Sequence, residues 1–244
     1  AKDVVDTAVA KQKELINNSN NLSDSEKQDL NQQVDAATKT AKDAIDGATT
    51  NDGATKAGQD GVAAIEAVTV PADSSVKKNA KDAIDKAAKT KDNAIDASNL
   101  TTEEKDALKK KVAGEVKIAK DNIDAATKDA DVKTAQTNGE KAINAVEIPA
   151  SVSKTDAINA INAALADKKA AINGTNLTDE EKTALINKAQ KLADDAIADI
   201  NKAATNEAVN TAKENGVETI NNVNVPTTSA TKDAAKNAID QAAK

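Results

Sequence analysis

One unit repeats three times along this chain, and the repetition constrains the fold more than any other feature of the sequence. Two short anchors define the unit: Asn-Leu-Ser/Thr at 21–23, 99–101 and 176–178, and Val/Ile-Pro at 70–71, 148–149 and 225–226. Each anchor recurs 78 and then 77 residues later. A fixed period of this size is typical of proteins in which one supersecondary unit is copied and its neighbours stack.

Each copy contains three amphipathic helical patterns, which are clearest in the second copy. Apolar residues recur there every three or four positions, as expected for one face of a helix. The first stripe is Val76, Ala80, Ile84, Ala87, Ala88 and Ile95; the second is Leu108, Val112, Val116, Ala119, Ile123 and Ala126; the third is Val132, Ala135, Gly139, Ile143 and Val146.

Boundary signals divide the copies in the same way. The segments 23–26, 101–104 and 178–181 each read Ser/Thr-x-x-Glu, a capping box that predicts the start of the second helix. Asn51, Asp129 and Asn206 fit the start of the third helix. We expect the Val/Ile-Pro pair to end that helix, because proline disfavours helix in the residue before it, and the first helix of the next copy to begin just after the pair.

These patterns predict an all-α fold, a tandem array of three antiparallel three-helix bundles stacked end to end into an elongated rod. An odd number of helices lets the chain enter a bundle at one end and leave at the other. The expected repeats are 1–71, whose first helix lacks its opening turns, 72–149 and 150–226. Residues 227–244 read as the start of a fourth first helix, in a piece cut from a longer array.

Composition restricts the core and the chemistry. The chain is 39% hydrophobic without a single Phe, Trp or Tyr, so only Ala, Val, Ile and Leu can fill a core, and that core must be thin. His and Cys are absent, which excludes zinc, haem and iron–sulfur ligation of the usual kinds, thiol nucleophiles and Ser-His-Asp catalysis. The net charge of −7 and the absence of a basic face argue against nucleic acid as a partner.

Several recurring residues invite a functional interpretation, and for each a structural one is favoured. Gly61, Gly139 and Gly216 occupy one mid-helix position, where glycine costs about 1 kcal/mol, so we expect close helix packing rather than a hinge or ligand contact. Aliphatic-Asp/Asn pairs such as Ile84-Asp85 could bind cations, but their polar member borders the core, where pairing with Lys is expected.

Two further motifs are interpreted in the same way. The Asn-Leu-Ser/Thr anchors match the glycosylation pattern, yet their hydroxyl is already explained as a helix cap. Lys27, Lys105 and Lys182 follow the capping Glu, but a slender bundle offers no water-restricted pocket for catalysis. We therefore expect no enzyme activity, no catalytic, cofactor-binding or metal-binding residues, and no cofactor.

The sequence also resembles a known family. The runs at 80–85 (Ala-Lys-x-x-Ile-Asp), 95–105 (Ile-Asp-x-Ser-Asn-Leu-Thr-x-Glu-Glu-Lys) and 139–146 (Gly-x-x-Ala-Ile-Asn-Ala-Val) resemble the Ebh-type helical repeats, a domain of unknown function found in giant cell-wall-anchored proteins of Gram-positive bacteria. The resemblance implies export, anchoring outside this segment, and a role in surface adhesins, cell adhesion and biofilms.

Two functions follow as hypotheses. In the first, the repeats are a non-catalytic, monomeric stalk that projects a distant binding region from the cell wall toward host matrix or neighbouring cells. In the second, the repeats themselves bind matrix or serum protein, or an identical chain. Exposed positions differ among the copies, as Gln32, Lys110 and Asn187 show, which favours the stalk. No segment is apolar enough for membrane insertion to be expected.

Overall fold

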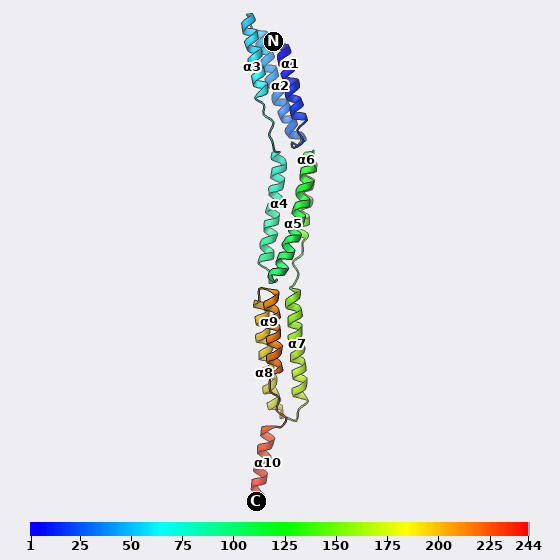
Figure 1. Cartoon of the computed structure of the whole chain (residues 1–244), viewed down its shortest axis with the longest axis vertical. Coiled ribbons are helices and arrows are strands. Elements are labelled where there is room, and N and C mark those ends of the chain that lie inside the picture. Colours follow the sequence, from blue (N-terminus) through cyan, green and yellow to red (C-terminus); the bar gives the residue numbers. More distant parts are fainter. Residues whose placement is uncertain (244) are drawn as a thin grey trace. The chain divides into compact units, whose positions relative to one another are not determined.

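The chain folds into ten α-helices and no strand over residues 1–243, which are the residues that the computed structural model describes (Figure 1). The expected all-α class is confirmed. The helices are α1 (Lys2–Asn17), α2 (Asp24–Gly47), α3 (Asn51–Glu66), α4 (Ser75–Asp96), α5 (Thr102–Ala125), α6 (Asp129–Ala145), α7 (Val152–Asn173), α8 (Asp179–Lys202), α9 (Asn206–Asn221) and α10 (Ala230–Ala242).

Two compact units divide the described chain. The first holds residues 1–93 and 111–146, and the second holds residues 94–110 and those from 147 onward. The division passes through α4 and α5, so each unit contains one whole three-helix set and part of the second set. The connection from the first set to the second therefore lies inside the first unit, and the connection from the second set to the third lies inside the second unit.

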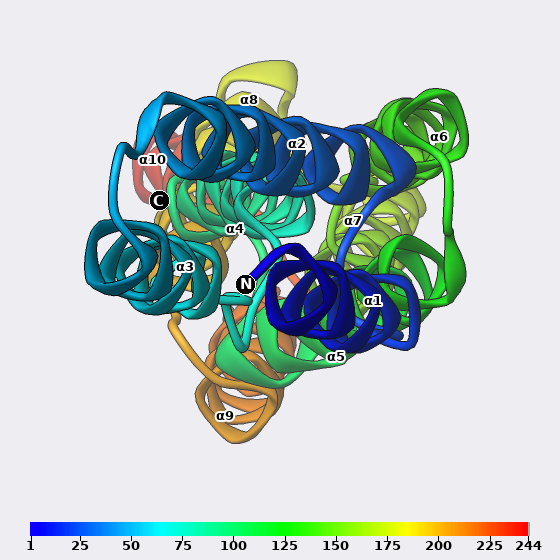
Figure 2. The same cartoon turned by 90° about the horizontal axis from the view of Figure 1, so that it is seen from above.

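Thin aliphatic cores hold the two complete sets together. In the first unit, α1, α2 and α3 surround a common centre (Figure 2), where Val5, Ile16, Val34 and Ile65 are fully buried. In the second unit, α7, α8 and α9 pack around the fully buried Ile161, Ile172, Ile200 and Ile220. Each such side chain contributes about 1.5–3 kcal/mol, and no aromatic adds a larger burial.

Glycine allows the second and third helices of each set to approach closely. A Cβ added to Gly61, Gly139 or Gly216 would lie 2.4, 2.4 or 2.5 Å from the Cβ of Ala41, Ala119 or Ala196, closer than two carbon atoms can pack. The expectation of close packing at these glycines is therefore confirmed. The residual space is so small that even a methyl group would force the helices apart.

The prediction that Val/Ile-Pro ends the third helix is wrong. The third helices end at Glu66, Ala145 and Asn221, several residues before the prolines. They end early because side chains from the first helix bind the carbonyls just beyond them. Gln12 Nε2 donates to the Val68 carbonyl at 2.5 Å. In the other two sets, Lys91 Nζ donates to the Val146 carbonyl at 3.0 Å and Lys168 Nζ to the Val223 carbonyl at 3.1 Å.

The first helices begin just after the Val/Ile-Pro pairs, as expected. They begin at Ser75, Val152 and Ala230, a few residues beyond each proline. A serine that the sequence analysis did not single out marks each start. Ser74, Ser151 and Ser229 accept hydrogen bonds from the backbone amides of Lys77, Lys154 and Lys232 at 3.0–3.1 Å.

Candidate functional site

The recurring polar residues meet where one three-helix set continues into the next. The predicted capping boxes supply the first half of this junction. Glu26 Oε2 accepts from the Ser23 amide at 3.0 Å, Glu104 Oε2 from the Thr101 amide at 3.0 Å, and Glu181 Oε2 from the Thr178 amide at 2.9 Å. All three boxes predicted from the sequence are present, and each orients its glutamate at the start of a second helix.

The other oxygen of the same glutamate binds the next set. Glu26 Oε1 accepts from the Ser75 amide (2.7 Å), the Ser75 hydroxyl (2.8 Å) and the Val76 amide (3.2 Å) at the start of α4. Glu104 Oε1 accepts from the Ser153 amide in α7 (3.1 Å), and Glu181 Oε1 from the Thr231 amide in α10 (3.2 Å). One carboxylate thus caps two helices that belong to successive sets; we call this contact the glutamate clamp.

Helix ends explain why a carboxylate serves both contacts. The first amides of a helix lack intrahelical partners and carry partial positive charge, so an anion placed there is stabilised. Burial alone would raise the pKa of Glu26, but hydrogen bonds from the Ser23 amide and from the start of α4 lower it from 4.5 to about 2. Hydrogen bonds from the Thr178 amide and from the start of α10 likewise lower the pKa of Glu181 to about 2.

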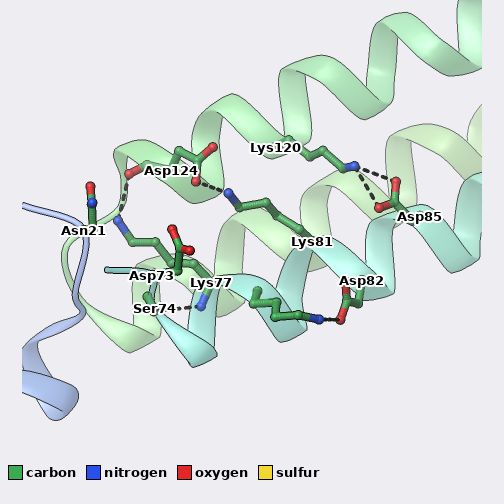
Figure 3. Close-up of a pocket in the computed structure, with 10 residues that line it drawn as sticks. Asn21, Asp73, Ser74, Lys77, Lys81, Asp82, Asp85, Lys120 and Asp124 are labelled. Carbon is green, nitrogen blue, oxygen red and sulfur yellow. Dashed lines mark hydrogen bonds and ion pairs between the residues drawn. The ribbon is translucent and has the colours of Figure 1, made fainter. Parts of the chain in front are cut away.

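A buried lysine lies beside the clamp. Lys77 and Lys154 are each only 5% exposed, three residues after the capping serine. Lys77 Nζ donates to the Asp124 carbonyl at the end of α5 (2.8 Å; Figure 3), and Lys154 Nζ donates to the Asn201 carbonyl at the end of α8 (2.9 Å). Each ammonium neutralises the negative end of a helix dipole.

The Asn of each Asn-Leu-Ser/Thr anchor also takes part in the junction. Asn99 Oδ1 accepts from Lys154 Nζ at 2.9 Å, and the Asn176 carbonyl accepts from Lys232 Nζ at 2.8 Å. Asn21 Nδ2 donates instead to the Ala72 carbonyl at 3.0 Å, in the segment that leads into α4. Asn176 Oδ1 also accepts from Lys232 Nζ at 3.2 Å, so the side-chain amides of all three anchors are engaged within the protein.

The lysines that follow the capping glutamates have a structural task. Lys27, Lys105 and Lys182 donate to the carbonyls of Asn17, Asp96 and Asn173 at the ends of the first helices, at 3.2, 2.9 and 3.2 Å. In the sequence, the alternative for these lysines was a catalytic pairing with the neighbouring glutamate. Both groups are instead committed to helix ends, the glutamate to N-termini and the lysine to a C-terminus.

The open hollow shown in Figure 3 contains opposed charges that pair with each other. Lys81 forms an ion pair with Asp124, and Lys120 lies 2.6 Å from Asp85. Lys78 pairs with Asp82 at 2.6 Å in the same hollow. The aspartates that follow an aliphatic residue therefore pair with lysine, as predicted. Their side chains remain more than half exposed, so each pair contributes at most about 1 kcal/mol.

One position in the second set lacks the partner that the other sets have. Lys13 pairs with Asp35 at 2.5 Å, and Lys169 donates to Gln190 at 2.6 Å. In the second set, Asp92 is equivalent to Lys13 and Lys169, and its Oδ1 is buried without a hydrogen-bond partner. Ala113 is equivalent to Asp35 and Gln190 and offers no polar group.

We expect Ala113→Lys to stabilise the second set by about 0.2–1 kcal/mol, because it offers a cation to Asp92. Urea unfolding followed by circular dichroism measures the change, and the double variant Asp92→Asn with Ala113→Lys is the control. If the lysine stabilised the set equally in both backgrounds, the gain would not come from its pairing with Asp92.

Comparison with known proteins agrees with this architecture. The fold defines a tandem helical-repeat protein. A family model described as Domain of Unknown Function (DUF1542) matches residues 1–73, 76–151 and 153–228, and the chain belongs to this family. A search of curated proteins and a search of solved structures each found no match.

Neither a metal-binding cluster nor a membrane-spanning helix is found among the described residues. Across residues 1–243, no group of three or more acidic side chains could hold a metal ion. In the same range, no helix has both the length and the apolar character needed to cross a bilayer.

Proposed function

We propose that these repeats act as a non-catalytic spacer, and the glutamate clamp is the observation that carries the proposal. The clamp uses the same three parts at each junction: a capping glutamate, the start of the next first helix, and the serine that caps that helix. A connection repeated with the same chemistry suits a chain that must continue through many copies in one manner.

The location of the charged side chains supports a spacer over an enzyme. The glutamates and lysines that recur in every copy are bound to helix ends inside the protein, which leaves them without a role toward a substrate. Exposed positions at one register carry Gln32, Lys110 and Asn187, so the three sets present different chemistry to solvent.

The biological setting of the proposal rests on family resemblance. We propose that the repeats belong to an exported surface protein anchored to a Gram-positive cell wall, and that they hold a distal binding region away from the cell. Host matrix protein or a neighbouring cell would then be a partner of the full-length protein. The competing function is direct binding by the repeats of a matrix or serum protein, or of an identical chain.

Small-angle X-ray scattering tests the spacer. Helices of 24 residues advance a repeat by roughly 36 Å at 1.5 Å per residue, so three in series should give a maximum dimension of roughly 100 Å or more. A globule of this chain length would instead have a radius of gyration of about 18 Å and would refute the spacer.

Sedimentation and titration separate the competing function from the spacer. We expect the sedimentation coefficient to stay that of a monomer as concentration rises, and calorimetric titration with fibronectin or albumin to give no heat of binding. Saturable binding of either protein, or reversible dimerisation, would favour the competing function.

A further inference from the structure

The junction from the first set to the second and the junction from the second set to the third differ in which helices of the following set they hold. At the junction inside the second unit, a second carboxylate is present: Glu103 Oε2 accepts from the Asn206 amide, the first residue of α9, at 3.0 Å. Thr102 adds two bonds to the Ala204 carbonyl, one from its amide at 2.8 Å and one from its hydroxyl at 3.0 Å. This junction therefore holds both the first and the third helix of the following set.

The junction inside the first unit lacks the second carboxylate. Ser25 occupies the register of Glu103 and bonds only within its own cap, 3.3 Å from Ser23. Asp24 occupies the register of Thr102; its amide donates to the Thr127 carbonyl at 3.0 Å, but it has no hydroxyl to add a second bond.

The helix that should be held at this first junction also starts without a cap. The N-cap of α6 is Lys128, which makes no side-chain cap bond, whereas Thr205 accepts from the Ala208 amide at 3.1 Å at the start of α9. Asp129 stands where Asn206 stands in the later set, and its Oδ1 is buried without a partner. A buried acceptor without a donor indicates a contact that is incomplete on one side.

We propose that the junction between the first and second sets is a hinge, and that the junction between the second and third sets is a rigid connection. The biological use of such a hinge rests on the proposed spacer function, but the experiment that tests the hinge does not. At the hinge, the following set is held by the Glu26 clamp and by two neutral bonds, from Asn21 Nδ2 to the Ala72 carbonyl and from the Asp24 amide to the Thr127 carbonyl. Neither of these two bonds reaches a residue of α6. At the rigid junction, Glu103 lies next to Glu104 on α5 and binds the first amide of α9, so a rotation about the Glu104 clamp must break this additional bond.

The strength of the added bond sets the size of the effect. A hydrogen bond to a charged group contributes about 1.5–3 kcal/mol, against about 0.5–1.5 kcal/mol for a neutral one. One such bond shifts the ratio of docked to undocked junctions about tenfold.

Pulsed electron–electron double resonance tests the difference, because it measures the distribution of distances between two spin labels. The chain has no cysteine, so cysteines can be placed at will. Gln28 and Lys133 span the first junction, and Asp106 and Asn210 are the equivalent exposed positions across the second. We expect a broad distance distribution for the first pair and a narrow one for the second.

Two variants exchange the properties of the junctions. Glu103→Ser copies the first junction into the second and should broaden its distribution, while amide exchange at Asn206 accelerates about tenfold. Ser25→Glu combined with Asp129→Asn copies the second junction into the first and should narrow it. Unchanged exchange of core amides in α7, α8 and α9 shows that the sets stay folded. Equal widths in the parent chain, or no response to Glu103→Ser, would overturn the proposal, whatever the scattering result.

Discussion

Replacing Gly139 with alanine should destabilise the second set by about 1–3 kcal/mol, because overpacking a tight contact costs that much. The added methyl group would lie 2.4 Å from the Cβ of Ala119 and 2.8 Å from the Cδ1 of Ile84. The isoleucine can rotate away, but the alanine cannot, so α5 and α6 must separate along the whole contact. Urea unfolding by circular dichroism, with amide exchange in α5 and α6 to locate the loss, measures the effect.

A second glycine in the same set provides the matched control. Gly114 lies in the interior of α5, and a Cβ added there meets nothing within 4 Å. Gly114→Ala should therefore stabilise the set by up to about 1 kcal/mol through helix propensity alone. The gain in propensity is common to both substitutions, so opposite signs isolate the contact. Adding Ala119→Gly should recover part of the loss in Gly139→Ala, and equal stabilisation by both alanines would refute the packing argument.

Replacing Glu26 with glutamine should loosen the start of α4 by about 1.5–3 kcal/mol, the contribution of hydrogen bonds to a charged group. Glutamine has a single oxygen to accept with, so it can keep the cap of α2 or the contact to α4 but not both. The amides of Ser75 and Val76, which donate to Glu26 Oε1, should exchange at least about tenfold faster.

The same contact depends on pH in a defined direction. The pKa of Glu26 is lowered from 4.5 to about 2, so its stabilising effect is complete above pH 4.5 and is lost as the pH falls through about 2. The difference in exchange between the parent chain and Glu26→Gln should vanish in that window. Glu115→Gln is the control, because no hydrogen bond or ion pair of Glu115 is found among the described residues. A difference that did not change between pH 6 and pH 2 would contradict this account.

Local sequence predicted the helices well. The starts of α2, α5 and α8 follow from the capping boxes, and the starts of α3, α6 and α9 from the Asn or Asp at each position. These signals act within one turn of helix, so they can be recognised in a single chain. The ends of the third helices were missed because their acceptors are bound by Gln12, Lys91 and Lys168, each more than 50 residues away.

The junction was only half predictable, and Glu26 shows why. Its bond to the Ser23 amide joins residues three apart and appears as a sequence pattern. Its bond to Ser75 joins residues 49 apart and has no pattern of its own. The one available signal was the polar cluster after each proline, which includes Ser74, Ser151 and Ser229. The capping-box pattern predicts the hydrogen bond of one carboxylate oxygen, and the hydrogen bonds of the other oxygen are found only in the structure.

The sequence by itself determined the repeat, the helical class, the phase of each apolar stripe and the places where helices begin, since periodicity and capping are local properties. Tertiary structure alone decided which oxygen of each glutamate faces the next set, which atoms a side chain at Gly139 would meet, and how the two junctions differ. Those outcomes depend on groups brought together by helix packing. The contact of Glu103 with the Asn206 amide, which Ser25 does not make at the equivalent position, exists only after the chain has folded.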